Sequence, residues 1–238
     1  MRTNRPFGRP FGGLLRRLPR RLLTAAAAGL LLTAAPPAAH ADPAPPPSPA
    51  PQASGAQGLR AFQQSYGLPP TGRVDITTAQ LLRSAPDSEL RRFFAAPSDL
   101  GPEQLAHART VIGVGKGAEL AKEAQVIALM TAMQESKFVN YTSPVDHDSL
   151  GVFQQRPSMG WGTAAQITHV PTASASFYGL PSPSANPGLL QIDGWESMEP
   201  GEACQAVQRS AHPDRYAQWE DFARDLLAQE GPDADPVR

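Results

Sequence analysis

The pattern of apolar and polar residues predicts helices in two parts of the chain. In the first part, Leu59, Phe62 and Tyr66 recur at the spacing of one helix face. A glycine- and proline-rich segment follows, and residues 75–78 supply N-cap candidates for a second short helix. No segment shows the sustained alternation of a β-strand, so we expect a mainly α-helical fold.

The second part, residues 98–229, predicts a longer set of helices. The pattern places them at 102–112, 118–136, 173–178, 201–210 and 215–227. The stretch 118–136 is apolar almost all round, which indicates a buried helix. Residues 142–163 are expected to be loop and 171–198 are dense in Pro, Ser and Gly, which indicates a long loop-rich insertion.

Both ends of the chain differ from these helical parts. Residues 1–41 hold seven arginines, no acid and an apolar run that ends near Ala39-His40-Ala41. This predicts a secretory signal peptide with a core too short to span a bilayer. The pairs Arg16-Arg17 and Arg20-Arg21 are compatible with twin-arginine export, but the residues around them fit that signal poorly, so we favour ordinary secretion. Residues 42–57 are almost wholly Pro, Ala, Ser and Gln and predict a semi-rigid linker, and 230–238 are expected to be a disordered tail.

Charge and cysteine content narrow the classes of partner. Removal of residues 1–41 would leave 14 Lys and Arg against 22 Asp and Glu, a net charge of −8. Such a chain offers no basic face to nucleic acid and is repelled by acidic membranes, so neither is an expected partner. The single cysteine, Cys204, excludes an intramolecular disulfide and is expected to be buried, so a packed core must stabilise the protein.

The first helical part resembles the repeat of peptidoglycan-binding domains. The matching residues are Phe62-Gln63, Tyr66-Gly67-Leu68, Thr71-Gly72-Arg73-Val74-Asp75, Thr78 and Leu81. The resemblance covers about half of the usual three-helix module within residues 58–97, so the module is either truncated or completed by residues 88–96. It implies that peptidoglycan is a partner and that the protein is associated with the cell wall.

Glu135 is the strongest candidate for chemistry. It continues a face of small residues at the end of the predicted helix 118–136, where another element can approach closely. That face consists of Ala121, Ala124, Ala128 and Ala132. The negative end of the helix dipole and partial burial would both raise the pKa of Glu135, as a general acid requires. Asn140 is a candidate for the left-handed residue that ends the helix.

Glu135-Ser136 together with Gly151-Val152-Phe153-Gln154 is similar to the motif of the lysozyme-like superfamily, especially goose-type lysozymes and soluble lytic transglycosylases. The motif's first Gly-Ala is replaced by Asp148-Ser149, and a later Tyr-Asn-Ala-Gly segment has only a loose echo at 206–210. The resemblance implies a lysozyme-like helical domain over residues 98–229.

This resemblance implies that Glu135 is the acid/base that cleaves the bond between N-acetylmuramic acid and N-acetylglucosamine. A transglycosylase needs no second carboxylate, whereas inverting hydrolysis needs a base roughly 6.5–9.5 Å away. Asp146 and Asp148 are the candidates for that base. We favour transglycosylation, and hydrolysis remains open.

Further residues are expected to bind the sugar chain. Gln154 and Gln155 can pair with acetamido groups, because an amide both donates and accepts hydrogen bonds. Trp161 is a candidate to stack on a sugar face, whereas Phe153 is expected in the core. Tyr216 is placed opposite Glu135 by the resemblance, and Ser136 completes the expected substrate-binding set.

The alternative to an enzyme is a non-catalytic peptidoglycan-binding protein with a degenerate lysozyme-like domain. The altered motif and the partial module favour that reading, whereas an acid at the end of a buried helix favours catalysis. A metal site at Asp146-His147-Asp148 is not expected, because three neighbours in sequence do not converge easily. No cofactor is expected, and the protein is expected to be a monomer.

Overall fold

A computed structural model describes residues 55–144 and 147–238 of the chain. Within these ranges the protein is helical, and its extended pairing is the single antiparallel bridge between Leu150 and Gln155, which confirms the mainly α-helical fold. The expected signal peptide, most of the expected linker and Asp146 lie outside the described residues. No helix in the described part is long and apolar enough to cross a membrane.

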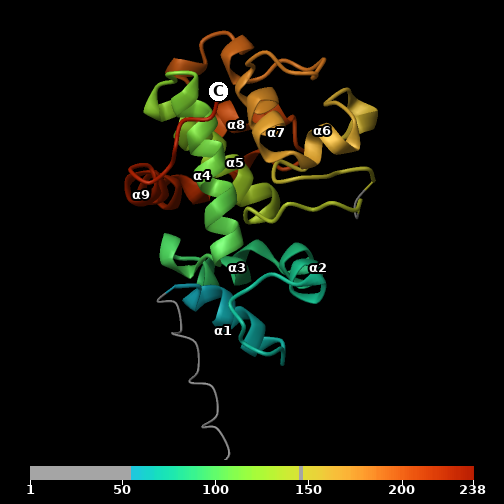
Figure 1. The fold of residues 1–238 in the computed structure, drawn as a ribbon, viewed down its shortest axis with the longest axis vertical. Helices are drawn as coiled ribbons and strands as arrows, with labels where there is room; N and C mark the ends of the chain where they lie inside the picture. The colour runs from blue at the N-terminus through green and yellow to red at the C-terminus, as the bar shows by residue number, and fades with distance from the viewer. Residues whose placement is uncertain (1–54, 145–146) are drawn as a thin grey trace, which may run out of the picture. The chain divides into compact units, whose positions relative to one another are not determined.

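The α-helices of the described part follow one another in the order shown in Figure 1. They are α1 (Gln57–Ser65), α2 (Ile76–Ser84), α3 (Asp87–Phe93), α4 (Pro102–Gly117), α5 (Lys122–Ser136), α6 (Ala164–Thr168), α7 (Val170–Tyr178), α8 (Pro200–Gln208) and α9 (Glu220–Glu230). Helix α4 runs five residues beyond its predicted end, and α6 was not predicted. The predicted helix 215–227 begins as 3-10 turns and becomes α-helical only at Glu220.

Helix α5 is the centre of the larger helical part, and α4, α7, α8 and α9 all contact it. Every residue from Ala124 to Met133 is buried, as the continuous apolar pattern of this stretch predicted. Cys204 on α8 is also buried, and its thiol donates to the carbonyl of Ile127 on α5 at 3.4 Å. Burial raises the pKa of Cys204 to about 12, so it is a core residue, as predicted.

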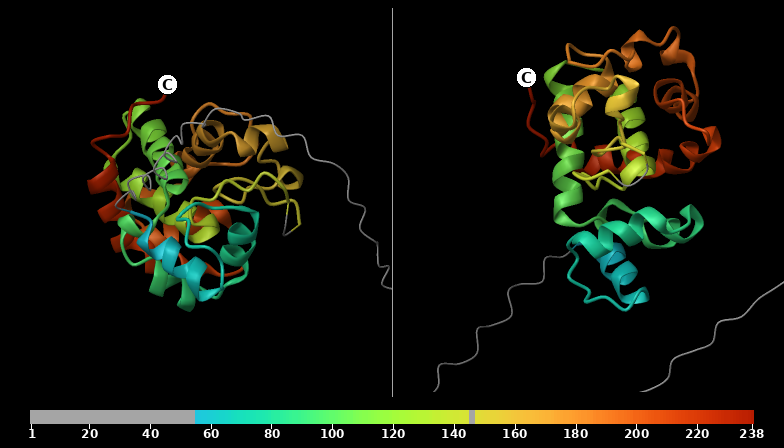
Figure 2. Two further views of the ribbon diagram at one scale, coloured as in Figure 1. Left: turned by 60° about the horizontal axis from the view of Figure 1, so that its bottom comes forward. Right: turned by 90° about the vertical axis from the view of Figure 1, so that its right-hand side faces the viewer.

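Helices α1–α3 form a small three-helix unit, here called the module. Its third helix, α3, lies in the region of residues 88–96 that was one of the two alternatives for completing the module. Leu59 and Phe62 of α1 are fully buried, and Phe62 meets Phe93 of α3 edge to face, with ring centroids 5.5 Å apart. Figure 2 shows α1–α3 grouped at one end of α4.

One buried side chain organises the loop between α1 and α2. The Gln63 amide donates to Thr71, to the carbonyl of Arg73 and to Thr78, and it accepts from the Gly72 amide at 2.9 Å. Buried polar groups of a loop need such partners, because water cannot reach them. The Phe-Gln and Thr-Gly parts of the module's motif are therefore one internal hydrogen-bond network.

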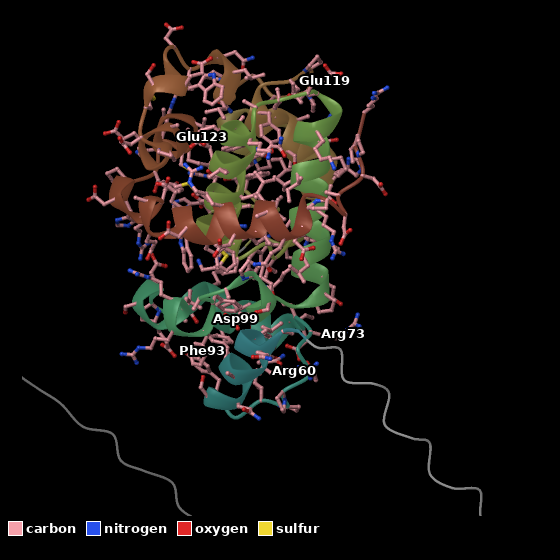
Figure 3. All side chains as sticks on the ribbon, turned by 90° about the vertical axis from the view of Figure 1, so that its left-hand side faces the viewer. Arg60, Arg73, Phe93, Asp99, Glu119 and Glu123 are labelled. Carbon is pink, nitrogen blue, oxygen red and sulfur yellow. The ribbon has the colours of Figure 1, made fainter. Side chains whose placement is uncertain are left out.

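The start of α1 lies very close to the end of α3. A side chain at Gly58 would overlap the carbonyl oxygen of Phe93, so only glycine fits there. Asp99 accepts hydrogen bonds from the Gly58 amide at 3.1 Å and the Ala96 amide at 2.9 Å. Figure 3 shows Phe93 and Asp99 beside α1.

The C-terminal residues do not form the disordered tail that the sequence predicted for 230–238. The Lys116 ammonium donates to the carbonyls of Gly231 and Ala234, and the Val237 amide donates to Gly113 at 2.8 Å. Ala234 is buried. The segment lies along α4, because the glycines of that helix leave room for its backbone.

Candidate active site

The carboxylate of Glu135 lies in the last turn of α5 and is only partly exposed. The buried face of α5 holds this turn in place, so the backbone of Glu135 is fixed by the core. The side chain leaves the helix where α5 meets the segment around Tyr216. The phenol of Tyr216 donates to Glu135 Oε1 at 2.6 Å.

Tyr216 and Glu135 are therefore brought together, as the resemblance implied, although 81 positions separate them. Tyr216 is 1% exposed, so its hydroxyl serves the carboxylate rather than bulk solvent. Burial and the neighbouring Glu135 both raise the pKa of Tyr216, which keeps the phenol protonated as a donor.

Burial raises the pKa of Glu135, and this is the largest effect on the group. Hydrogen bonds from Tyr216 and Gln208 lower the pKa and offset part of the rise. The positive charges of Lys137 and Arg215 also lower it, by smaller amounts. The result is a carboxyl group that holds its proton to higher pH than an ordinary glutamate, the property that a general acid needs.

Helix α5 ends in two consecutive left-handed residues, Lys137 (φ 54°) and Phe138 (φ 59°). The expectation that Asn140 ends the helix is therefore wrong; its amide instead donates to the carbonyl of Thr168 at 2.8 Å. Side chains of α4 hold the turn, since Gln104 donates to the carbonyl of Lys137 at 2.7 Å and His107 Nδ1 lies 2.8 Å from that of Phe138.

Lys137 places a buried positive group near Glu135. Its ammonium donates to the carbonyl of Gln134 at 3.0 Å and lies 5.3 Å from the centroid of the Trp219 ring. Burial lowers the pKa of Lys137 to about 8, while the negative charges of Asp87 and Glu135 raise it and limit the fall. Since Lys137 is still mostly protonated at neutral pH, it favours the ionised form of Glu135.

A tight turn at residues 150–155 packs against the end of α5. The Ser136 hydroxyl lies 2.7 Å from the carbonyl oxygen of Val152 and joins the helix to the turn. Gly151 has φ +72°, and a side chain there would lie 2.5 Å from the carbonyl oxygen of Ile167. Phe153 is fully buried and stacks on Phe177 at 4.7 Å between centroids, so it is in the core, as predicted.

The two glutamines of this turn have different surroundings. Gln154 has φ +49°; its amide donates to the carbonyl of Gly151 at 2.9 Å and accepts from Arg83 at 2.8 Å. Gln155 is 2% exposed and donates to the carbonyl of Ala173 at 3.2 Å. Its Oε1 is buried without a partner among the described residues. Gln154 is thus the better placed of the two to reach a ligand.

Two cavities adjoin at Glu135, and together we call them the groove. The amide cavity has a volume of about 400 Å³ and is lined by Trp161, Asn186 and Gln208 among others. The module cavity has a volume of about 430 Å³ and lies between the α2–α3 corner and the end of α5. Glu135, Ser149 and Gln154 line both cavities. Glu135 therefore stands at the junction, with space on either side of it.

Backbone strain concentrates along this groove. Non-glycine residues with positive φ are uncommon, and such residues gather at functional sites because the surrounding structure must hold them. Lys137, His147, Gln154 and Arg209 have positive φ and line one or both cavities.

The carboxylate of Asp148 is bound by donor groups of Arg156 and Ser158. Its carboxylate pairs with Arg156 at 2.7 Å and accepts from the Ser158 amide at 2.6 Å and the Ser158 hydroxyl at 2.9 Å. The Arg156 guanidinium and the Ser158 amide hold the pKa of Asp148 well below its usual range. A carboxylate so stabilised in its ionised form is a weak base.

Several groove residues were missed by the sequence analysis. Gln208 and Arg209 belong to the segment 206–210, whose weak echo of a family motif was the available signal. Arg83 and Asp87 come from the module and Arg215 from the segment before α9. Nothing in their local patterns predicts that they line a cavity together with Glu135, because this depends on how distant segments pack.

Comparison with known families identifies one segment of the chain. Residues 53–82 match the family model described as "Putative peptidoglycan binding domain". This confirms the resemblance expected for the first helical part, and it supports binding to the cell wall with peptidoglycan as partner. The match ends within α2 and thus covers a short part of the chain. Among curated proteins, none matches the chain.

Proposed function

We propose that this protein is an exported cell-wall enzyme that cleaves peptidoglycan glycan strands at the bond between N-acetylmuramic acid and N-acetylglucosamine. The carrying observation is Glu135: a carboxyl group with a raised pKa, hydrogen-bonded to Tyr216, at the junction of two cavities. In this role Glu135 protonates the glycosidic oxygen as the bond breaks.

The site also suits a sugar polymer. Trp161 is 9% exposed and lines the amide cavity, where an aromatic face can pack on a sugar ring. Asn186, Gln154 and Gln208 bring amide groups to the same cavity, and amides match the acetamido groups of both sugars. Ser136 and Gln155 hold the turn at residues 150–155 in place beside this cavity. Ser136 bonds the turn to α5, and Gln155 bonds it to α7.

Transglycosylation is the favoured reaction. In that reaction Glu135, once deprotonated, takes the proton of the muramoyl 6-hydroxyl, and this oxygen closes on C1 to give a 1,6-anhydro end. The state of Asp148 supports this choice, because its oxygens are occupied by Arg156 and Ser158. Asp146 lies outside the described residues and is the remaining candidate base for hydrolysis.

Digestion in ¹⁸O-labelled water tests the reaction. Purified peptidoglycan is incubated with the full-length protein, and the released fragments are analysed by mass spectrometry. Transglycosylation predicts anhydro ends without label, whereas hydrolysis would place one ¹⁸O at each new reducing end. Labelled reducing ends that disappear in Asp146→Asn would transfer the second role to that residue.

The second candidate is a binding protein without catalysis, and the match of residues 53–82 favours it. It predicts that the protein sediments with insoluble peptidoglycan but releases no fragments, under conditions in which a known muramidase does. Binding alone gives no reason for a partly buried acid at the junction of two cavities, so we rank it second.

A further inference from the structure

We propose that the module forms one wall of the groove and that Arg83 there binds a carboxylate of the peptidoglycan stem peptide. This inference rests on the proposed function only in taking peptidoglycan as the ligand of the groove. It assigns a ligand to the module cavity, which lies on the module's side of Glu135.

The module is fixed against the end of α5 by polar contacts from several elements. Asp87 at the start of α3 pairs with Arg215 at 2.8 Å and accepts from Gln134 on α5 at 3.3 Å. The Tyr141 hydroxyl donates to the carbonyl of Ala79 on α2 at 2.9 Å. The module therefore contributes to the groove itself and does not act only as a tether to the wall. In Figure 2 (right) α2 and α3 lie beside the segment that follows α5.

Arg83 carries a positive charge that the described residues do not neutralise. Its guanidinium donates to Gln154 Oε1 at 2.8 Å and lies 5.4 Å from the centroid of the Tyr141 ring, and both partners are neutral. Within residues 55–144 and 147–238, no carboxylate forms an ion pair with it. Arg83 is half-buried and lines the module cavity, so its remaining donors are near the space that a ligand would fill.

The other cations of this cavity are differently placed. Arg215 is already paired with Asp87, and Lys137 is 4% exposed beneath the surface. Arg83 is therefore the group that gives the cavity an attraction for anions. Because a guanidinium binds carboxylates in a two-pronged geometry, a carboxylate is its best-matched ligand.

The chemistry of peptidoglycan identifies the source of that carboxylate. The glycan strand itself offers neutral hydroxyl and acetamido groups, whereas its negative charges lie on the stem peptides. A stem peptide hangs from the muramoyl unit next to the bond that Glu135 would cleave. Arg83 is close to this bond, because its hydrogen-bond partner Gln154 lines both cavities, as Glu135 does. The geometry thus favours substrates that retain their stems.

Binding by an inert protein tests this without requiring cleavage. The full-length Glu135→Gln variant is titrated calorimetrically with a tetrasaccharide that carries its tetrapeptide stems, and with the same tetrasaccharide after the stem carboxylates have been converted to primary amides. We expect the ligand with free stem carboxylates to bind at least about tenfold more tightly, as a charged hydrogen bond provides. Adding Arg83→Gln should remove most of this preference, while Arg83→Lys should retain part of it.

A matched control is Arg92→Gln, an exposed arginine of the same module that lines neither cavity. It should leave the preference unchanged. Equal affinity of the Glu135→Gln protein for both ligands, or binding of neither, would overturn the inference. So would an equal loss for both ligands in Arg83→Gln, since Arg83 would then only hold the module in place. Absence of cleavage by the wild type would contradict the proposed function yet leave this preference measurable.

Discussion

The module and the groove use the polar residues of their motifs in different ways. In the module, the Gln63 amide bonds to the loop around it, and the Asp75 carboxylate accepts from the Thr78 amide at 2.7 Å as the N-cap of α2. Along the groove, Glu135 and Gln154 have partners on one side and cavity on the other. The polar residues of the module's motif thus stabilise a folding unit, whereas those of the motif at Glu135 line the two cavities of the groove.

This difference has a consequence for where peptidoglycan binds. Of the described residues of the matched segment, 55–82, only Leu82 lines the groove, and Arg83 follows it directly. Substitutions inside the module should therefore alter stability, and substitutions along the groove should alter activity.

The largest effect is expected for Glu135→Gln. Loss of the acid should slow fragment release from purified peptidoglycan by about 10³-fold, within the range typical of general acid catalysis. Glu123→Gln is the matched control, because Glu123 lies on the same helix and pairs with Arg224 on α9 at the surface. Its rate should equal that of the wild type; a similar loss in both variants would mean that the effect is not specific to Glu135.

Tyr216→Phe should give the next largest effect on activity. The lost hydrogen bond to a charged group corresponds to roughly 10- to 100-fold slower cleavage. Because the phenol lowers the pKa of Glu135, its removal should raise that pKa and shift the alkaline limb of the pH–rate profile to higher pH. A slower rate with an unmoved limb would assign Tyr216 a purely structural role.

Gln63→Leu should affect the module in a different way. The change leaves the Gly72 amide buried without an acceptor, so the free energy of unfolding should fall by about 2 kcal/mol. Denaturant unfolding measures it, with Gln64→Leu at the neighbouring exposed position as the control. Cleavage per folded molecule should not change; a loss of cleavage at full stability would contradict the division between module and groove.

Glu135→Gln should also change the pH dependence of stability. The folded-state pKa of Glu135 is raised, so the native state binds more protons than the unfolded state above the ordinary glutamate pKa of 4.5. The wild type therefore loses stability as pH rises from about 4.5 through the raised value. The thermal midpoint of the variant should therefore rise relative to that of the wild type over the same pH interval. A difference between the two midpoints that stays constant from pH 4 to pH 8 would argue against the raised pKa.

The smallest effect is expected for Asp148→Asn. An asparagine can still accept from Ser158, and the transglycosylase reaction does not use Asp148, so the cleavage rate should stay within about threefold of the wild type. A loss comparable to that of Glu135→Gln would instead favour a two-carboxylate hydrolase.

The sequence predicted the parts of the site that depend on local pattern. The buried helix α5 and the position of Glu135 at its end follow from periodicity, and the core position of Phe153 was also expected. The contact of Tyr216 with Glu135 was expected from family resemblance alone, because periodicity gives no information about contacts across 81 positions. The pairing of Asp148 with Arg156 needed the turn geometry between them.

Other features depended on packing that no local pattern reveals. Lys137 ends α5 in a left-handed conformation because Gln104 and His107 on α4 hold the carbonyls of the turn. Residues 230–238 were expected to be a disordered tail, yet Lys116 and the backbone of Gly113 on α4 form hydrogen bonds with them. In both cases the stabilising groups lie on α4, which is distant in sequence from the segment that it contacts.

The most direct test of the account measures new 1,6-anhydro ends released from purified peptidoglycan by the wild type, Glu135→Gln and Glu123→Gln at equal concentration of folded protein. The account predicts anhydro ends from the wild type and from Glu123→Gln at matching rates, and essentially none from Glu135→Gln. Wild-type protein that sediments with peptidoglycan but produces no new ends, while a known muramidase digests the same sample, would contradict it.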